Sequence, residues 1–152
     1  MNKKDIVIEV QMLIRTPAKE VFEAIVNPEI TKHFWFTKGS AKLQKGTTVT
    51  WEWEMYNVSS EVIVHDIIPN EKVSVVWGEP KTNIDFLLHA VDDQSTYLKI
   101  QNYGFEQIDD ASFMSFIIDS TGGFTTVIDG MKAYLENGIN LNLIADKFLR
   151  EQ

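Results

Sequence analysis

Apolar and polar residues alternate along much of the chain, and this alternation predicts a β-sheet. In residues 5–15 most apolar side chains fall on one side, with Val7 and Leu13 as exceptions, as in a strand with one buried face. Between Lys42 and Tyr103 the same pattern recurs in short segments separated by turn residues, which is typical of an antiparallel meander. We predict strands over residues 5–15, 47–57, 58–68, 73–77, 84–91 and 96–103.

Two short helices are predicted directly after the first strand. Thr16-Pro17 stops that strand and suits a helix start, because threonine can cap a helix and proline fits its first position. An apolar stripe at helical spacing follows in residues 21–26, and Asn27-Pro28 ends it. A second short helix is predicted over residues 29–34, at the aromatic run Phe34-Trp35-Phe36.

A longer helix is predicted near the C-terminus. Apolar residues spaced three and four apart between Phe124 and Leu135 form one face of it. We place its start at Ser120-Thr121-Gly122-Gly123 and its end at Asn137-Gly138, because glycine commonly follows the last helical residue. Residues 109–119 form a helical or mixed segment, and the tail after Gly138 has room for one more helical turn.

This order of elements indicates an α+β fold in which the sheet packs on the long helix. An antiparallel sheet of this length has one face to bury, and the long helix is the element that can cover it. A strongly curved sheet around one helix leaves a space between them, which is either packed shut or forms a cavity. A chain of 152 residues fits a single domain, residues 1–152.

Composition and charge exclude several classes of function. The formal net charge of −8 argues against nucleic acid and against anionic membrane surfaces, since both require clustered Lys and Arg. The chain has no cysteine, so disulfides and thiolate chemistry are excluded. No apolar run is long enough for a signal core or a membrane span, which makes the cytoplasm the expected location.

Sequence motifs for nucleotide, metal or nucleophilic chemistry are missing. The sequence has no glycine-rich phosphate-binding loop and no serine nucleophile elbow. His33, His65 and His89 lie far apart in the sequence, without the spacing of metal ligands. We therefore expect no cofactor and no metal.

The segment VTWEWEMY, residues 49–56, permits more than one interpretation. Glu52 and Glu54 lie two apart on one strand, about 6.6–7 Å from each other, a spacing that can hold a general acid and base. The favoured interpretation places them in solvent, because burial of two carboxylates without partners costs several kcal/mol. Trp51 and Trp53 then face inward, either as core or as the wall of an apolar ligand site. A one-residue slip or bulge would reverse these faces.

Four segments resemble motifs of the START-like (SRPBCC) superfamily, in its order and with compatible spacing: residues 16–35 (TPAKEVFEAIVNPEITKHFW), 67–77 (IIPNEKVSVVW), 95–105 (STYLKIQNYGF) and 122–148 (GGFTTVIDGMKAYLENGINLNLIADKF). Within the superfamily the chain is similar to the branch named for the activator of the heat-shock-protein-90 ATPase. Phe124 stands where that branch usually has tryptophan, and Asn70 stands for the second proline of a turn. The resemblance implies a helix-grip fold, in which about seven strands curl around the C-terminal helix and two small helices follow the first strand. It places the seventh strand in residues 36–43.

The inferred curved sheet, its aromatic inward face and the lack of a catalytic set favour a first function, a non-enzymatic domain that binds a small hydrophobic ligand. Other START-like branches bind lipids, hormones or polyketides between the sheet and the long helix. We expect the lining on the inward faces of these two elements, at Trp51, Trp53, Trp77, Phe86, Leu98, Phe124, Ile128 and Met131.

Two other functions and one structural alternative stay open. The resemblance implies a co-chaperone-like module that binds a heat-shock chaperone, stimulates its ATPase and serves the stress response, although eukaryotic domains of this type are parts of larger proteins. A cyclase-like or hydrolase-like enzyme would use Glu52, Glu54, His65 or Tyr103 inside the cavity. The interior can also be fully packed, with the surface carrying the function. In each case the chain is expected to be a monomer or a homodimer.

Overall fold

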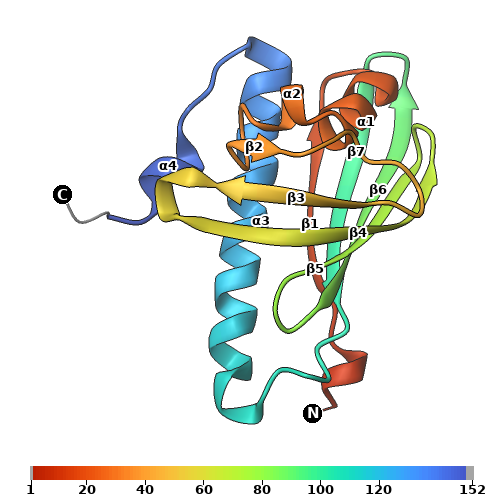
Figure 1. The fold of residues 1–152 in the computed structure, drawn as a ribbon. Helices are drawn as coiled ribbons and strands as arrows, with labels where there is room; N and C mark the ends of the chain where they lie inside the picture. The colour runs from red at the N-terminus through yellow and green to blue at the C-terminus, as the bar shows by residue number, and fades with distance from the viewer. Residues whose placement is uncertain (1, 150–152) are drawn as a thin grey trace.

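Seven antiparallel strands form one curved sheet in the computed structural model, which describes residues 2–149 (Figure 1). The strands are β1 (Ile8–Ile14), β2 (Lys38–Gly39), β3 (Thr48–Trp53), β4 (Val58–Ile68), β5 (Lys72–Trp77), β6 (Thr82–Asp92) and β7 (Ser95–Tyr103). Their order across the sheet is β1-β7-β6-β5-β4-β3-β2. The predicted α+β helix-grip fold is confirmed, and β2 is the seventh strand expected within residues 36–43.

Four α-helices accompany the sheet within the described residues. They are α1 (Ala18–Val26), α2 (Pro28–Thr31), α3 (Asp110–Asn137) and α4 (Leu143–Lys147), with short 3-10 turns at η1 (Lys3–Asp5) and η2 (Glu54–Tyr56). The two small helices predicted after the first strand are α1 and α2, which lie together near β2 (Figure 1). None of the helices in this part of the chain is both long and apolar enough to cross a membrane.

The long helix α3 begins ten residues earlier than the sequence pattern predicted, at Asp110 instead of Ser120. Asp109 caps it, because its carboxylate accepts a hydrogen bond from Ser112 N at 2.9 Å. The prediction of a helix start in residues 120–123 was wrong, since this stretch lies inside α3. Threonine hydroxyls here and just beyond donate to carbonyls four residues earlier, at 2.7 to 2.8 Å, which keeps them inside the helix. The predicted end is confirmed, with Gly138 at a φ of 67°.

The strand predicted over residues 47–57 is shorter in the structure and ends at Trp53. The next three residues form η2, and Asn57 then takes the left-handed conformation with a φ of 52°. Asparagine visits this conformation more readily than most residues, because its short polar side chain can bond locally. The turn into β4 therefore uses residues that the alternation alone assigned to a strand.

Along β3 the alternation correctly predicts which face is buried. Val49, Trp51 and Trp53 are 3%, 1% and 8% exposed and belong to the main core. Glu52 lies on the opposite face of the strand, and Glu54 is exposed in η2. No bulge interrupts the pairing of β3 with β4, so the faces are not reversed.

Helix α3 docks on the edge strand β1 through the ion pair of Lys132 and Glu136, whose polar atoms are 2.5 Å apart. Lys132 Nζ donates to Leu13 O at 2.9 Å, and the Glu136 carboxylate accepts from Arg15 N at 2.8 Å. The ion pair therefore provides hydrogen-bond partners for the Leu13 carbonyl and the Arg15 amide, at the C-terminal end of the edge strand β1. Desolvation opposes ionisation of Glu136, but the Arg15 amide and the Lys132 ammonium outweigh it, so the pKa of that carboxyl lies below its usual value.

Replacing Glu136 with Gln is expected to lower the free energy of unfolding by about 1–2 kcal/mol near neutral pH, because a charged acceptor is lost. A carboxyl whose pKa falls on folding stabilises the native state above its unfolded pKa, and this contribution disappears as the pH drops through the folded pKa. The difference between wild type and variant should therefore shrink below about pH 4. Urea unfolding at about pH 7 and about pH 3 measures it, with the exposed Glu106→Gln as control. An equal difference at both pH values contradicts this role.

Candidate ligand-binding site

The indole of Trp35 is the centre of an aromatic cluster between the sheet and α3. Its ring centroid lies 4.8 Å from that of Trp51, 5.7 Å from Trp77, and 6.2 Å from both Trp53 and Phe124. Trp53, Trp77 and Phe124 meet the Trp35 ring edge to face at 63° to 69°, as aromatic quadrupoles favour, and Trp51 is tilted against it at 58°. The cluster contains all four tryptophans of the chain and forms a rigid, interlocked surface.

The loop after α2 folds inward and carries Trp35 to this place. Trp35 N donates to Thr31 O at 3.1 Å, which continues the turn of α2. The Thr31 hydroxyl donates to Ala24 O at 2.5 Å and ties the loop to α1. A Cβ atom at Gly39 in β2 would lie 2.7 Å from Pro28 Cβ, so the return of the loop to the sheet requires glycine. These contacts of the loop with α1, α2 and β2 therefore fix where the indole enters the core.

An open cleft of about 980 Å³ lies beside this cluster, between the strand ends of β3, β4 and β5 and the middle of α3. The short helix α4 and Phe148 form a further wall. Buried and half-buried residues of the lining include Trp35, Trp53, Trp77, Phe116, Phe124 and Val127, and exposed ones include Val58, Glu61, Glu79, Lys81, Asp119, Lys147 and Phe148. The volume lies at the upper end of the range for ligand pockets, roughly 300–1,000 Å³.

Gly123 contributes to the opening on the helix side. It lines the cleft together with Ser120 and Phe124 of α3. A Cβ atom built at Gly123 meets no other atom within 4 Å, so a side chain there would project into free space. Glycine in a helix interior lowers helix stability by about 1 kcal/mol relative to alanine. At position 123 it also leaves space in the cleft that a side chain would occupy.

Three of the eight residues predicted to line a ligand site form part of the cleft wall: Trp53, Trp77 and Phe124. The other five lie in the packed core and are at most 1% exposed: Trp51, Phe86, Leu98, Ile128 and Met131. These five side chains do face inward, but they pack in the core and do not line the cleft. That Trp53, Trp77 and Phe124 contact a ligand stays a prediction.

Several cleft residues were not among those predicted from the sequence. Trp35 lies in a loop, and Phe116 lies in the part of α3 whose pattern was mixed. Ile144 and Phe148 belong to the tail after the long helix. The available signal was the aromatic run of residues 34–36, because three large rings in a loop need a surface on which to be buried.

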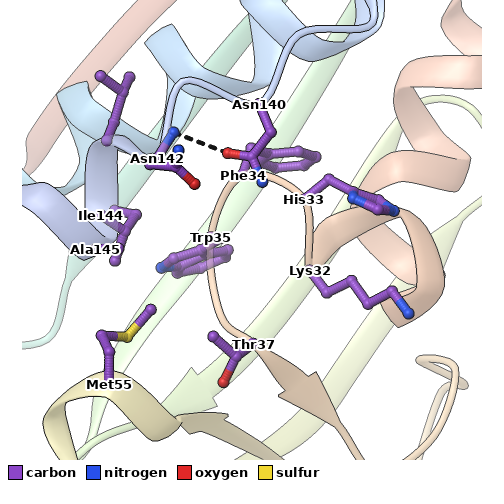
Figure 2. Close-up of a pocket in the computed structure, with 11 residues that line it drawn as sticks. Lys32, His33, Phe34, Trp35, Thr37, Met55, Asn140, Asn142, Ile144 and Ala145 are labelled. Carbon is purple, nitrogen blue, oxygen red and sulfur yellow. Dashed lines mark hydrogen bonds between the residues drawn. The ribbon is translucent and has the colours of Figure 1, made fainter.

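Trp35 and Ile144 also border a second pocket of about 150 Å³ (Figure 2). Figure 2 shows the side chains of Lys32 and His33 directed away from Trp35. His33 instead stacks on Tyr134, with ring centroids 4.7 Å apart. The pocket is smaller than a typical ligand site, and the larger cleft is therefore the candidate site.

Tyr56 fastens α4 to the turn between β3 and β4, which lies beside α4 in Figure 1. Its hydroxyl donates to Ile144 O at 2.5 Å and accepts from Phe148 N at 3.3 Å. On the other side of α4, Lys147 Nζ donates to the Thr126 hydroxyl of α3 at 3.2 Å. No residue of α4 is fully buried, so polar bonds contribute much of what holds this wall in place.

The four residues of the enzymatic alternative do not line the cleft. Glu54 and His65 are exposed, and Glu52 lies on the face of β3 opposite the tryptophans. The Tyr103 hydroxyl lies 3.1 Å from the Asp85 carboxylate, and burial together with this carboxylate raises the pKa of Tyr103, which keeps it protonated. Among residues 2–149 no group of three or more His, Asp or Glu side chains is placed to hold a metal ion. These residues therefore give the enzymatic alternative no support.

A curved antiparallel sheet that grips a long C-terminal helix beside an apolar cleft defines the class of protein, a START-like (SRPBCC) domain. The model of the family described as Activator of Hsp90 ATPase homolog 1-like protein matches residues 15–136. This match spans more than half of the chain, and the chain therefore belongs to that family. The comparison with curated proteins gives no match.

Solved structures share this fold over most of the chain. Protein SSP2350 from Staphylococcus saprophyticus is 24% identical with a TM-score of 0.78, and the alignment covers 90% of this chain and 96% of that one. The Aha1 dimer from Colwellia psychrerythraea is 19% identical with a TM-score of 0.74, covering 88% and 98%. DynU16, a protein of the dynemicin biosynthetic locus, is 16% identical with a TM-score of 0.77, covering 90% and 49%. At these identities the likeness shows the fold alone.

Replacing Tyr56 with Phe is expected to loosen α4, because the hydroxyl then no longer donates to the Ile144 and Ala145 carbonyls or accepts from the Phe148 amide. The donated and the accepted bond each contribute about 1 kcal/mol, so hydrogen exchange of the Asp146 amide in α4 should quicken by about 30-fold. Tyr97→Phe is the matched control, since Tyr97 is half-buried and its hydroxyl makes no hydrogen bond within the described residues. Unchanged exchange at Asp146 in the Tyr56 variant would show that the hydroxyl does not hold α4.

Proposed function

We propose that the protein is a non-enzymatic START-like domain that binds a small hydrophobic ligand in the cleft between sheet and α3. The observation that supports this most directly is the aromatic lining of an open cleft of about 980 Å³. The ligands of related branches, lipids among them, set the starting panel for a binding screen. A cytoplasmic location, expected from the sequence, is part of the same proposal.

The cleft suits an apolar ligand because its floor exists before the ligand binds. Trp35, Trp53 and Phe124 are 7%, 8% and 4% exposed, and their rings are held by one another. A ligand therefore binds with little rearrangement of the protein, which lowers the entropic cost. Each roughly 100 Å² of apolar surface removed from water contributes about 2.5 kcal/mol. A compact ring compound that covers the floor is thus large enough for measurable affinity.

Replacing Gly123 with Leu should weaken ligand binding and stabilise the fold at the same time. The new side chain enters the free space of the cleft. Leucine also has a helix propensity more favourable than that of glycine by about 1 kcal/mol. The neutral fluorescent probe N-phenyl-1-naphthylamine reports binding through energy transfer from the tryptophans. We expect its affinity to fall at least about tenfold and the melting temperature to rise by about 2–5 °C.

Thr125→Leu is the matched control for the Gly123 variant. Thr125 is exposed on α3 and does not line the cleft, so leucine there should leave probe binding unchanged. Full-strength probe binding by a folded Gly123→Leu protein would overturn the cleft as the binding site. A wild-type protein that binds no probe at about 100 μM would overturn the proposed function itself.

A second candidate function is a co-chaperone-like module that binds a heat-shock chaperone. The observation that favours it is a pair of apolar residues one turn apart on α3, Met114 and Ile118, which are each 63% exposed. Exposed apolar groups that adjoin one another are typical of protein contact surfaces. The family description names an activator of the Hsp90 ATPase, and a role in the stress response would follow from such an activity. The oligomeric state, monomer or homodimer, belongs to the same proposal, and the Colwellia protein is described as a dimer.

The double substitution Met114→Gln and Ile118→Gln tests this second candidate. Glutamine is at least as good a helix former as methionine and isoleucine, and it removes their apolar character. Stimulation of the chaperone ATPase should fall at least about fivefold, while naphthylamine binding in the cleft stays unchanged. The ATPase assay with the chaperone of the same cell measures it. No stimulation by saturating wild-type protein would remove this candidate.

A further inference from the structure

Among residues 2–149, five charged side chains line the cleft and are exposed around its mouth, and three of the five are acidic. The carboxylates are Glu61 on β4, Glu79 in the β5–β6 turn and Asp119 on α3, and the ammonium groups are Lys81 and Lys147. Among the described residues, none of these three carboxylates takes part in an ion pair. The mouth therefore carries a negative excess, of the same sign as the net charge of −8 of the whole chain.

The two ammonium groups do not offset this excess equally. Lys147 Nζ donates to the Thr126 hydroxyl at 3.2 Å and lies 5.8 Å from the centre of the Phe148 ring. Its charge is thus engaged with the wall of the cleft. Lys81 is exposed in the same turn as Glu79, and its ammonium forms no ion pair among the described residues. An entering anion meets carboxylates from three separate elements.

The buried residues that line the cleft, within the described part of the chain, are apolar and uncharged. They include Trp35, Trp53, Phe124 and Val127. A charge moved to this depth would lose its water without gaining a partner, which is costly. A ligand must therefore turn a ring toward the floor and keep any charged group at the mouth. Aromatic walls also favour aromatic rings through their quadrupoles.

From this arrangement we infer, on the basis of the proposed function, that the cleft selects a small aromatic compound with an amine at one end. The ring system packs on the tryptophans, and the ammonium group lies at the mouth among Glu61, Glu79 and Asp119. A carboxylate ligand of the same shape would pack on the same rings, but the acidic residues of the mouth would repel its charge. Fatty acids are disfavoured by their charge and also by the entropy of ordering a flexible chain.

Three compounds of nearly one shape separate charge from shape: 1-naphthylmethylamine, 1-naphthalenemethanol and 1-naphthoate. Each is titrated against the wild-type protein loaded with N-phenyl-1-naphthylamine, and displacement of the probe is measured. The amine should bind most tightly and the carboxylate most weakly, with about tenfold between them at low salt. Added salt should narrow this ratio, because it screens the charges of the mouth. A carboxylate that binds as tightly as the amine overturns the inference.

Charge reversal at the mouth tests which residues set the selection. Glu61→Lys gives the mouth a positive excess and should reverse the order of the amine and the carboxylate. Glu71→Lys is the matched control, because it changes the net charge by the same amount in the β4–β5 turn, outside the cleft lining. It should leave the order unchanged, and an equal effect of both variants overturns the role of the mouth.

The outcomes also separate this inference from the proposed function. If the neutral probe binds and is displaced equally by all three compounds, the proposed function stands and the inference of an amine ligand falls. If the wild-type protein binds no probe, the proposed function fails, and this inference fails with it.

Discussion

The insertion of one indole ring between sheet and helix is the interaction on which the rest of the structure depends. A loop carries Trp35 into this space, where it is 7% exposed and contacts rings from β3, β5, β6 and α3. The helix itself is fastened at the opposite edge of the sheet, where Lys132 and Glu136 bond to β1 and the residue after it. The aromatic cluster fills the space between the sheet and α3 on the side away from β1. The outermost rings of the aromatic cluster form the floor of the cleft.

Gly123 and helix α4 shape the cleft, and each lowers the local stability of the protein. Gly123 leaves a free space within α3, although glycine weakens a helix interior by about 1 kcal/mol. Helix α4 has no fully buried residue and is held through the Tyr56 hydroxyl and Lys147. A protein that only needed a packed core would gain stability from a larger side chain at position 123. Departures from the locally favoured choice are expected where a site has a function, and they fall at this cleft.

The sequence predicted the fold well because the fold follows from periodicity. Alternation identified the buried face of β3 correctly, and the small helices, the end of α3 and the position of β2 also agree with the structure. The start of α3 was missed because residues 120–123 combine hydroxyl and glycine residues that are common at helix ends. Here their hydroxyls bond inside the helix, and the true cap is Asp109. Element boundaries depend on such single contacts, which periodicity does not contain.

The site was only partly predictable, for a different reason. Alternation shows that Trp51 and Trp53 both face inward, but it does not show that one is packed at 1% exposure and the other borders a cleft. That distinction depends on where the loop of Trp35 and the tail of Ile144 return to the sheet. Both segments are irregular, and their positions come from tertiary contacts. Sequence patterns therefore predicted the inward face, whereas the structure was needed to divide it into core and cleft wall.

The most direct test of this account is the indole N–H spectrum of the four tryptophans during titration with N-phenyl-1-naphthylamine. Trp35, Trp53 and Trp77 line the cleft, whereas Trp51 lies in the core and serves as an internal control. A ligand on the aromatic surface is expected to shift the three cleft signals together with one dissociation constant and to shift the Trp51 signal least. Four unchanged signals, or a Trp51 signal that shifts most, would contradict a ligand site on this aromatic surface.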